Sequence, residues 1–170
     1  MNLLSGCFAF LQATETVSSL PNEIRWEDTT PYIPNVERGK VIKVYDGDTI
    51  TVASKLPHDD TLYRFSVRLN GIDCPEIKSN DEGEIQCAKL AKKMVSDLIL
   101  NKNVELKNIK LEKYGRLLAD VYYDGTDITH TLLDNHLAVV YNGKSKNSPS
   151  DWLSYYQQRE TLGTHQTSSL

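Results

Sequence analysis

The chain has 170 residues, which is enough for one domain with its own hydrophobic core and no disulfide framework. Hydrophobic residues make up 39% of the sequence and charged residues 25%, as in soluble globular proteins and unlike disordered chains. The formal net charge of −4 argues against a uniformly basic surface for nucleic acid. However, residues 38–142 hold 15 Lys and Arg against 16 Asp and Glu, so most of the excess acidity lies in the flanks. A locally basic groove is therefore compatible with the composition.

The first 37 residues are expected to form an extension that is mostly loop. The stretch 3–11 is apolar apart from Ser5 and Gly6, but it is far too short to span a bilayer. It also lacks the basic residues that open a signal peptide. Acylation of Cys7 and a simple hydrophobic tail are alternatives, so a secreted and a membrane-tethered location both stay open.

The three cysteines are too few and too scattered for a disulfide scaffold or a zinc site. Cys74 and Cys87 could form one bridge in an oxidising compartment. The alternative is two small, half-buried thiols, and the sequence does not decide between them.

Three β-strands are expected over residues 40–45, 49–53 and 63–69, where β-branched and aromatic residues alternate in part with polar ones. Turn sequences separate the strands, and the first of these turns contains Asp46-Gly47. Three consecutive strands with short connections predict an antiparallel meander.

Apolar residues then recur at helical spacing over residues 84–101, which predicts an amphipathic helix. Two more strands are expected over 104–109 and 117–123, followed by a short helix over 127–136. A last helix is expected over 151–161, with Ser148 or Ser150 as its N-cap.

This order of elements predicts an α+β, mainly β fold: a five-stranded OB-fold barrel with three helices. We place the domain at residues 38–162 and expect a disordered tail over 163–170. Barrels of this type commonly bind oligonucleotides, but a fold alone does not establish a function.

Two acidic segments are candidates for chemistry. Asp46 and Asp48 are two residues apart at the end of a strand, so both carboxylates can point to one site, although Asp-Gly is also a plain hairpin turn. In the second segment, Pro75 restricts Cys74 and fixes the direction of its carbonyl group. Because a hard cation takes carboxylate and carbonyl oxygens, Asp48, Asp73 and the Cys74 carbonyl could form a partial metal shell.

Three other side chains complete this set. Glu76 would be available to orient or deprotonate a water molecule. Arg68 alternates with apolar residues of its strand, and Arg116 follows the turn Tyr114-Gly115. Each arginine alone could be a salt-bridge partner or a surface residue, but two arginines at one acidic site suit binding of phosphoryl oxygens.

In combination and order, these blocks resemble the staphylococcal nuclease family, also called the thermonuclease family. The resemblance covers residues 40–142, about 60% of the chain, and includes Ala91-Lys92-Lys93-Met94-Val95 in the expected helix. It rests on three blocks: Val44-x-Asp46-Gly47-Asp48-Thr49, Arg68-Leu69-x-Gly71-Ile72-Asp73-x-Pro75-Glu76, and Lys113-Tyr114-Gly115-Arg116-x-Leu118-Ala119.

The resemblance implies a role for each matching residue. It implies a Ca²⁺ site from Asp48, Asp73 and the Cys74 carbonyl, with Asp46 in support. It implies Glu76 as the general base, or as the group that positions the attacking water, and Arg68 and Arg116 as phosphate clamps. Lys113 and Tyr114 match positions that contact a nucleotide phosphate, and Tyr141 matches an aromatic residue that packs against a base. The cysteine at position 74 departs from the type member's threonine, but only its carbonyl is required.

The resemblance implies a calcium-dependent nuclease that hydrolyses DNA and RNA with little sequence preference and leaves 3′-phosphate ends. Single-stranded or frayed nucleic acid is the expected partner, and a monomer is the expected state. The rival hypothesis is an inactive barrel that only binds nucleic acid or a protein. The acidic net charge predicts weaker binding of long DNA than a basic relative would show.

Overall fold

The computed structural model describes residues 20–143 and 147–163. The chain divides into two compact units, Met1–Pro31 and Tyr32–Leu170. In the described part of the first unit, one turn of 3₁₀ helix spans Trp26–Asp28, and the Asp28 carboxylate accepts a hydrogen bond from the Arg25 backbone N–H at 2.9 Å. The apolar stretch 3–11, Cys7 and nearly all of the tail expected over 163–170 lie outside the described residues.

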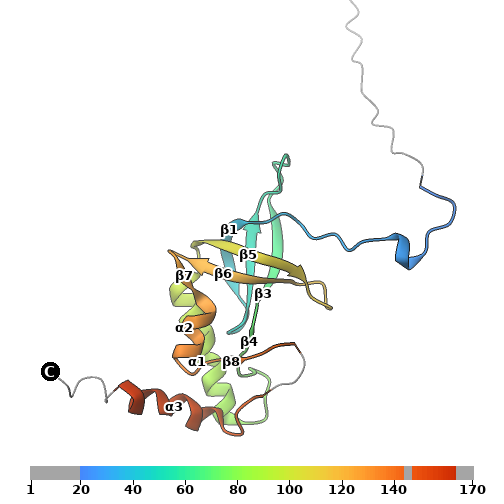
Figure 1. Ribbon diagram of the computed structural model, residues 1–170. Coiled ribbons are helices and arrows are strands. Elements are labelled where there is room, and N and C mark those ends of the chain that lie inside the picture. Colours follow the sequence, from blue (N-terminus) through green and yellow to red (C-terminus); the bar gives the residue numbers. More distant parts are fainter. Residues whose placement is uncertain (1–19, 144–146, 164–170) are drawn as a thin grey trace, which may run out of the picture. The chain divides into compact units, whose positions relative to one another are not determined.

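The second unit is built around a closed five-stranded barrel, as the sequence predicted (Figure 1). The strands follow one another around the barrel in the order β3-β2-β1-β5-β6, and a parallel pairing of β3 with β6 closes it. Their bounds are β1 Arg38–Val44, β2 Thr49–Ser54, β3 Tyr63–Leu69, β5 Asn103–Leu111 and β6 Leu117–Tyr123.

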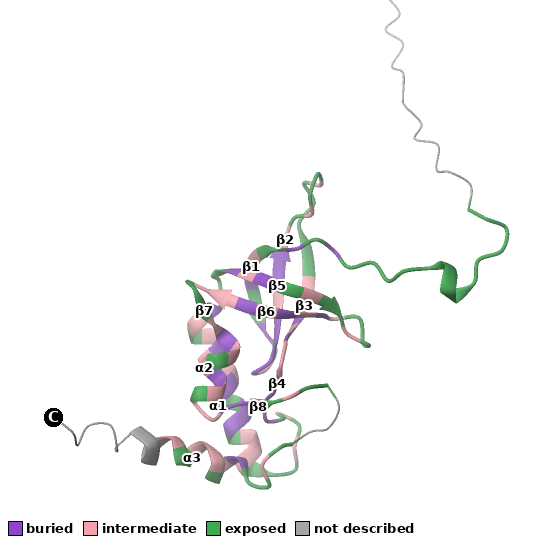
Figure 2. Ribbon diagram, viewed as in Figure 1, coloured by how far each residue is buried: buried purple, intermediate pink, exposed green. Residues whose placement is uncertain are grey.

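Alternation along the strands separates the core from the site. In β3, Val67 and Leu69 are fully buried, whereas Arg68 between them is only half-buried. In β6, Leu117, Ala119 and Val121 are buried in the same alternating way (Figure 2). Side chains on successive residues of a strand point to opposite faces, so the apolar filling of the barrel places Arg68 on its other face.

Three α-helices accompany the barrel in the described part of the chain, which agrees with the expected number. Helix α1, Glu82–Ile99, begins at Asp81, whose carboxylate accepts a hydrogen bond from the Glu84 N–H at 2.6 Å. It buries Cys87, Ala91, Val95 and Ile99 in the core.

Helix α2, Ile128–Asp134, is capped by Asp127, and helix α3 spans Trp152–Gly163. The expected cap of α3 was wrong. Asp151, not Ser148 or Ser150, accepts the hydrogen bond from the Ser154 N–H at 3.0 Å.

Three short strands complete the second unit. Strand β7, Thr126–Asp127, pairs with the end of β6. Strand β4, Ile72–Asp73, pairs antiparallel with β8, Val139–Val140. This small ribbon brings residue 141 beside the end of β3, where the Tyr141 N–H donates to the Gly71 carbonyl at 2.8 Å. None of the helices in the described residues is long and apolar enough to cross a bilayer.

Candidate active site

The turn between β1 and β2 presents the first acidic segment. The Tyr45 N–H donates to the Thr49 carbonyl at 2.8 Å, and the Asp48 N–H donates to Asp46 Oδ1 at 3.2 Å. Gly47 lies in this turn and packs closely against α1 and Cys74. A Cβ atom added at Gly47 would lie 2.8 Å from Ala91 Cβ and 2.9 Å from Cys74 Sγ. Close approach to α1 therefore requires glycine at this position.

Asp48 is a buried carboxylate, with only 5% of its surface exposed. Thr49 Oγ1 donates to its Oδ1 atom at 2.8 Å, and Arg68 Nη1 lies 2.5 Å from its Oδ2 atom. Burial raises the pKa of Asp48 from 3.8 to about 6, and the attraction of Arg68 opposes this shift without cancelling it. Burial thus makes the negative charge of Asp48 unfavourable, and positive partners must compensate it.

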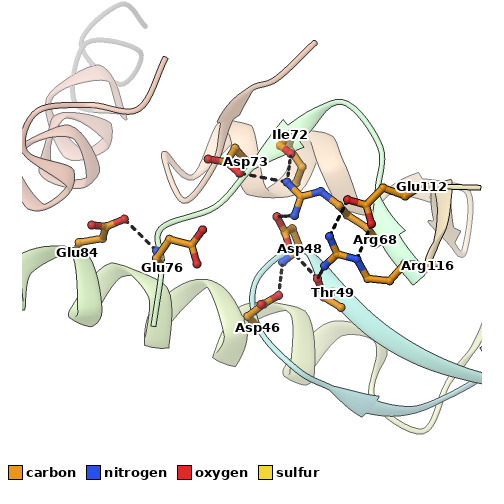
Figure 3. Close-up of polar contacts among 10 residues, drawn as sticks. All are labelled: Asp46, Asp48, Thr49, Arg68, Ile72, Asp73, Glu76, Glu84, Glu112 and Arg116. Carbon is orange, nitrogen blue, oxygen red and sulfur yellow. Dashed lines mark hydrogen bonds and ion pairs between the residues drawn. The ribbon is translucent and has the colours of Figure 1, made fainter. Parts of the chain in front are cut away.

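Arg68 connects the two acidic segments (Figure 3). Its Nη1 atom contacts Asp48, while its Nη2 atom lies 3.1 Å from Asp73 Oδ1 and 3.2 Å from the Ile72 carbonyl. Asp73 is almost fully buried, at 3% exposure. The planar guanidinium group therefore bridges two buried carboxylates, one from the β1–β2 turn and one from β4.

Arg116 reaches the same cluster from the β5–β6 hairpin, in which Gly115 adopts a φ of +81°. Its Nε and Nη2 atoms donate to the two carboxylate oxygens of Glu112 at 2.8 and 2.9 Å. Its Nη1 atom donates to Thr49 Oγ1 at 3.3 Å. Because Thr49 in turn donates to Asp48, one hydroxyl group links Arg116 to the buried carboxylates.

The sequence analysis missed Glu112. The hydrogen bonds from Arg116 lower the pKa of Glu112, and the same contact raises the pKa of Arg116, so both groups are held in their charged forms. The available signal was its position four residues before Arg116, across a turn that contains glycine. Glu112 fixes the direction in which Arg116 points.

Glu76 approaches from a different side. Its side chain is exposed, and in Figure 3 it lies on the side of Asp46, away from Glu112 and Arg116. Its backbone N–H donates to Glu84 Oε1 at 3.0 Å, which attaches the loop after β4 to the first turn of α1. Glu84 is a second residue that the sequence analysis missed.

A pocket of about 430 Å³, which we call the Tyr141 pocket, opens beside Arg68. Arg68, Lys110, Lys113 and Tyr141 are among its lining residues, so three of the predicted site residues meet here. Tyr114 is not among them. Its ring is 72% exposed and lies under the Lys113 ammonium group at 4.7 Å.

Comparison with known proteins identifies the family. The model of staphylococcal nuclease homologues matches residues 66–161, more than half of the chain. The chain belongs to the staphylococcal nuclease family. This confirms the resemblance on which the predicted site was based, and β1 and β2 extend the barrel beyond the matched segment.

Several relatives in this family carry nuclease names. An uncharacterized endonuclease of Haemophilus influenzae is 36% identical over 102 residues, which are 60% of this chain and 51% of that protein. Endonuclease YncB of Bacillus subtilis is 31% identical over 134 residues, covering 74% of this chain and 60% of that protein. A micrococcal nuclease of Shigella flexneri is 30% identical over 132 residues, covering 72% of this chain and 68% of that protein. The chain thus spans about half of the first of these relatives.

The predicted metal site offers oxygen donors, which suit a hard cation. Asp48 offers carboxylate oxygens from the β1–β2 turn and Asp73 from β4, and the Cys74 carbonyl follows directly. Burial raises the pKa of the Cys74 thiol well above its usual range, and the nearby carboxylates of Asp48, Asp46 and Asp73 raise it further. The carboxylates of Asp46, Asp48 and Asp73 therefore all lie near Cys74.

The described residues contain no group of three or more Asp, Glu, His or Cys side chains placed to hold a metal ion. The predicted shell has only two such side chains, and Arg68 bridges them. Cys74 and Cys87 are both free and buried, so the bridge that the sequence left open is absent.

Proposed function

We propose that this chain is a nuclease that hydrolyses phosphodiester bonds of DNA and RNA with little sequence preference. The observation that carries this proposal is that Arg68 bridges a buried carboxylate pair beside the Tyr141 pocket, and that the Thr49 hydroxyl links Arg116 to the same pair. A protein that only needed to balance the charge of Asp48 would need one arginine. Membership of the family and the endonuclease names of its relatives support the same activity.

The two arginines are the proposed clamps on the scissile phosphate. A guanidinium group presents parallel N–H donors that match two phosphoryl oxygens, and it stays charged at any working pH. Arg68 is held in place by two carboxylates and Arg116 by Glu112, so both are oriented before substrate arrives. Charge that develops on the phosphoryl oxygens in the transition state would thus meet fixed donors.

Glu76 is the proposed general base. Its exposed carboxylate lies on the side of the cluster away from Arg116, where water has access. A carboxylate there can orient a water molecule and accept its proton as the water attacks phosphorus. The 5′-oxygen would then leave on the opposite side, so the 3′-phosphate remains on the upstream product.

Calcium is the proposed cofactor, with Asp48, Asp73 and the Cys74 carbonyl as the groups that would hold it and Asp46 in support. A bound divalent cation would offset negative charge on the phosphoryl group and lower the pKa of a coordinated water. Arg68 already contacts both carboxylates, so it would share them with the cation.

The Tyr141 pocket is the proposed site for one nucleotide. The Tyr141 ring would stack against a base, and Lys113, with Tyr114 at the rim, would contact a phosphate. Stacking accepts every base, which accounts for little sequence preference. It also requires an unstacked base, so single-stranded or frayed nucleic acid is the proposed substrate, cleaved by the monomer.

The decisive experiment is digestion of single-stranded DNA by the purified chain with calcium and then with a calcium chelator. Cleavage should require calcium, leave 3′-phosphate ends, and fall at least about 100-fold in Glu76→Gln. Glu82→Gln is the matched control, because it removes the same charge from an exposed position in α1. Binding without cleavage in any buffer would replace the proposal with the inactive nucleic-acid-binding barrel.

A further inference from the structure

A second pocket lies on the Glu76 side of the carboxylate cluster. It has a volume of about 380 Å³, and we call it the Lys92 pocket. Its lining comes from β1, the β1–β2 turn, the loop after β4 and α1, and it includes two of the predicted site residues. Three lysines and one tyrosine line the pocket together with the carboxylates of these two residues: Lys43, Tyr45, Lys78 and Lys92, with Asp46 and Glu76.

The three lysines of this pocket are available to a ligand. Among the described residues, none of them forms an ion pair, whereas the adjacent Lys93 pairs with Asp97 at 2.5 Å. Lys92 is half-buried in α1 and lines the pocket. Lys43 Nζ lies 5.8 Å from the centre of the Tyr45 ring, and that ring is 53% exposed.

The Lys92 pocket and the Tyr141 pocket share no residue, but the site connects them. The Tyr141 pocket includes Arg68, and the Lys92 pocket includes Asp46 and Glu76. Asp48 spans the gap, since its N–H donates to Asp46 and its carboxylate contacts Arg68. A phosphodiester held at the arginines would therefore have a basic, tyrosine-containing pocket on either side.

We propose that the Lys92 pocket binds the nucleotide on the opposite side of the scissile phosphodiester from the nucleotide in the Tyr141 pocket. Its lysines contact the neighbouring phosphate, and Tyr45 stacks on the base. Basic grooves lined with aromatic rings are the general means by which proteins hold single strands without reading their sequence. This inference rests on the proposed function and extends it, because a strand held on both sides is cut at internal bonds.

The test measures binding of a fluorescein-labelled single-stranded octadeoxynucleotide in chelator, so that no cleavage occurs, at several salt concentrations. The variant Lys43→Met/Lys92→Met removes two charges and keeps the apolar stems. Each phosphate contact on a single strand contributes a salt slope of roughly 0.7. The variant should lower the slope by at least about this amount and raise Kd by roughly tenfold at low salt.

Two further variants distinguish binding in the Lys92 pocket from a general effect of positive charge. Lys93→Met removes the same charge from the adjacent position of α1, outside the pocket, and should leave the salt slope unchanged. Tyr45→Ser should raise Kd at least roughly fivefold with the slope unchanged, because stacking carries no counterion release. In calcium, the double variant should raise KM and leave kcat within about twofold, as expected for a group that binds substrate and transition state equally.

The outcomes distinguish the two proposals. If the wild-type chain binds and cleaves the octanucleotide but the double variant keeps its slope and KM, the Lys92 pocket is not a substrate site and only this inference fails. An equal loss in Lys93→Met would also overturn it, since the effect would then be general charge. If the wild-type chain neither binds nor cleaves the octanucleotide, the proposed nuclease function fails and this inference fails with it.

Discussion

Replacing Asp48 by asparagine should make the folded protein more stable in metal-free buffer at neutral pH. Asp48 is 5% exposed, and burial raises its pKa to about 6 although Arg68 lies 2.5 Å away. Asparagine has nearly the same shape: its oxygen can keep the contact with Arg68, while its NH₂ group donates to Thr49 Oγ1, which can accept as well as donate. It removes only the charge that burial disfavours.

The magnitude follows from linkage. A rise in the pKa of Asp48 from 3.8 to about 6 corresponds to about 3 kcal/mol, at roughly 1.4 kcal/mol for each unit. Because the pKa is raised in the folded state, the proton binds the folded state more tightly than the unfolded chain. The cost of the charged carboxylate is therefore absent below about pH 4, grows between pH 4 and 6, and is complete above that range. The advantage of asparagine should follow the same course.

The measurement is urea unfolding in chelator at pH 4 and pH 7.5, for the wild type, Asp48→Asn and the control Asp134→Asn. The control removes the same charge from an exposed position, and it should change the free energy of unfolding by no more than about 0.5 kcal/mol at either pH. Asp48→Asn should exceed the wild type by only about 0.5 kcal/mol at pH 4 and by about 3 kcal/mol at pH 7.5. An equal difference at both pH values, or a less stable variant at pH 7.5, would refute the account of Asp48 as a charge that burial disfavours.

Three other substitutions test separate parts of the site. Arg68→Lys should lower kcat by about 10²–10³, because a point charge cannot replace the planar fork; near-full turnover would remove the clamp role. Glu112→Ala should lower kcat roughly 10- to 100-fold with unfolding unchanged, since Arg116 loses both hydrogen bonds that orient it; unchanged kcat would show that this orientation is unimportant. Gly47→Ala should lower the free energy of unfolding by about 1–3 kcal/mol, because the added methyl group would meet Cys74 and α1; urea unfolding measures this, and an unchanged midpoint would contradict it.

The strands could be predicted because the alternation of apolar and polar side chains that favours a strand is visible within each short segment of sequence. β3 alternates between buried Val67 and Leu69 and half-buried Arg68, and the same period of two is visible in the sequence. The α3 cap could not be chosen in this way. Ser148, Ser150 and Asp151 are all good N-cap residues, and the backbone path decides which of them meets the free N–H groups.

The parts of the site that the sequence did not predict are contacts between segments. Glu112 orients Arg116 only because the β5–β6 hairpin folds the two together. Thr49 was visible as part of a motif, but the hydrogen bond that it accepts from Arg116 spans 67 positions of sequence. The motifs thus supplied the residues that are proposed to face the substrate, and the fold alone revealed those that hold them in place.

The acidic net charge at first argued against a nucleic-acid partner. This objection is weaker once the positions of the charged residues in the fold are known. Asp48 and Asp73 are buried and bridged by Arg68, and Glu112 is paired with Arg116. Because salt at about 0.1 M screens exposed charges beyond about 10 Å, an approaching strand responds to the groups nearest to it and not to the sum over the chain. Those groups include the lysines that line the two pockets, together with the exposed carboxylate of Glu76. The weak binding of long DNA expected from a net charge of −4 is therefore compatible with the proposed contacts to a few nucleotides at the site.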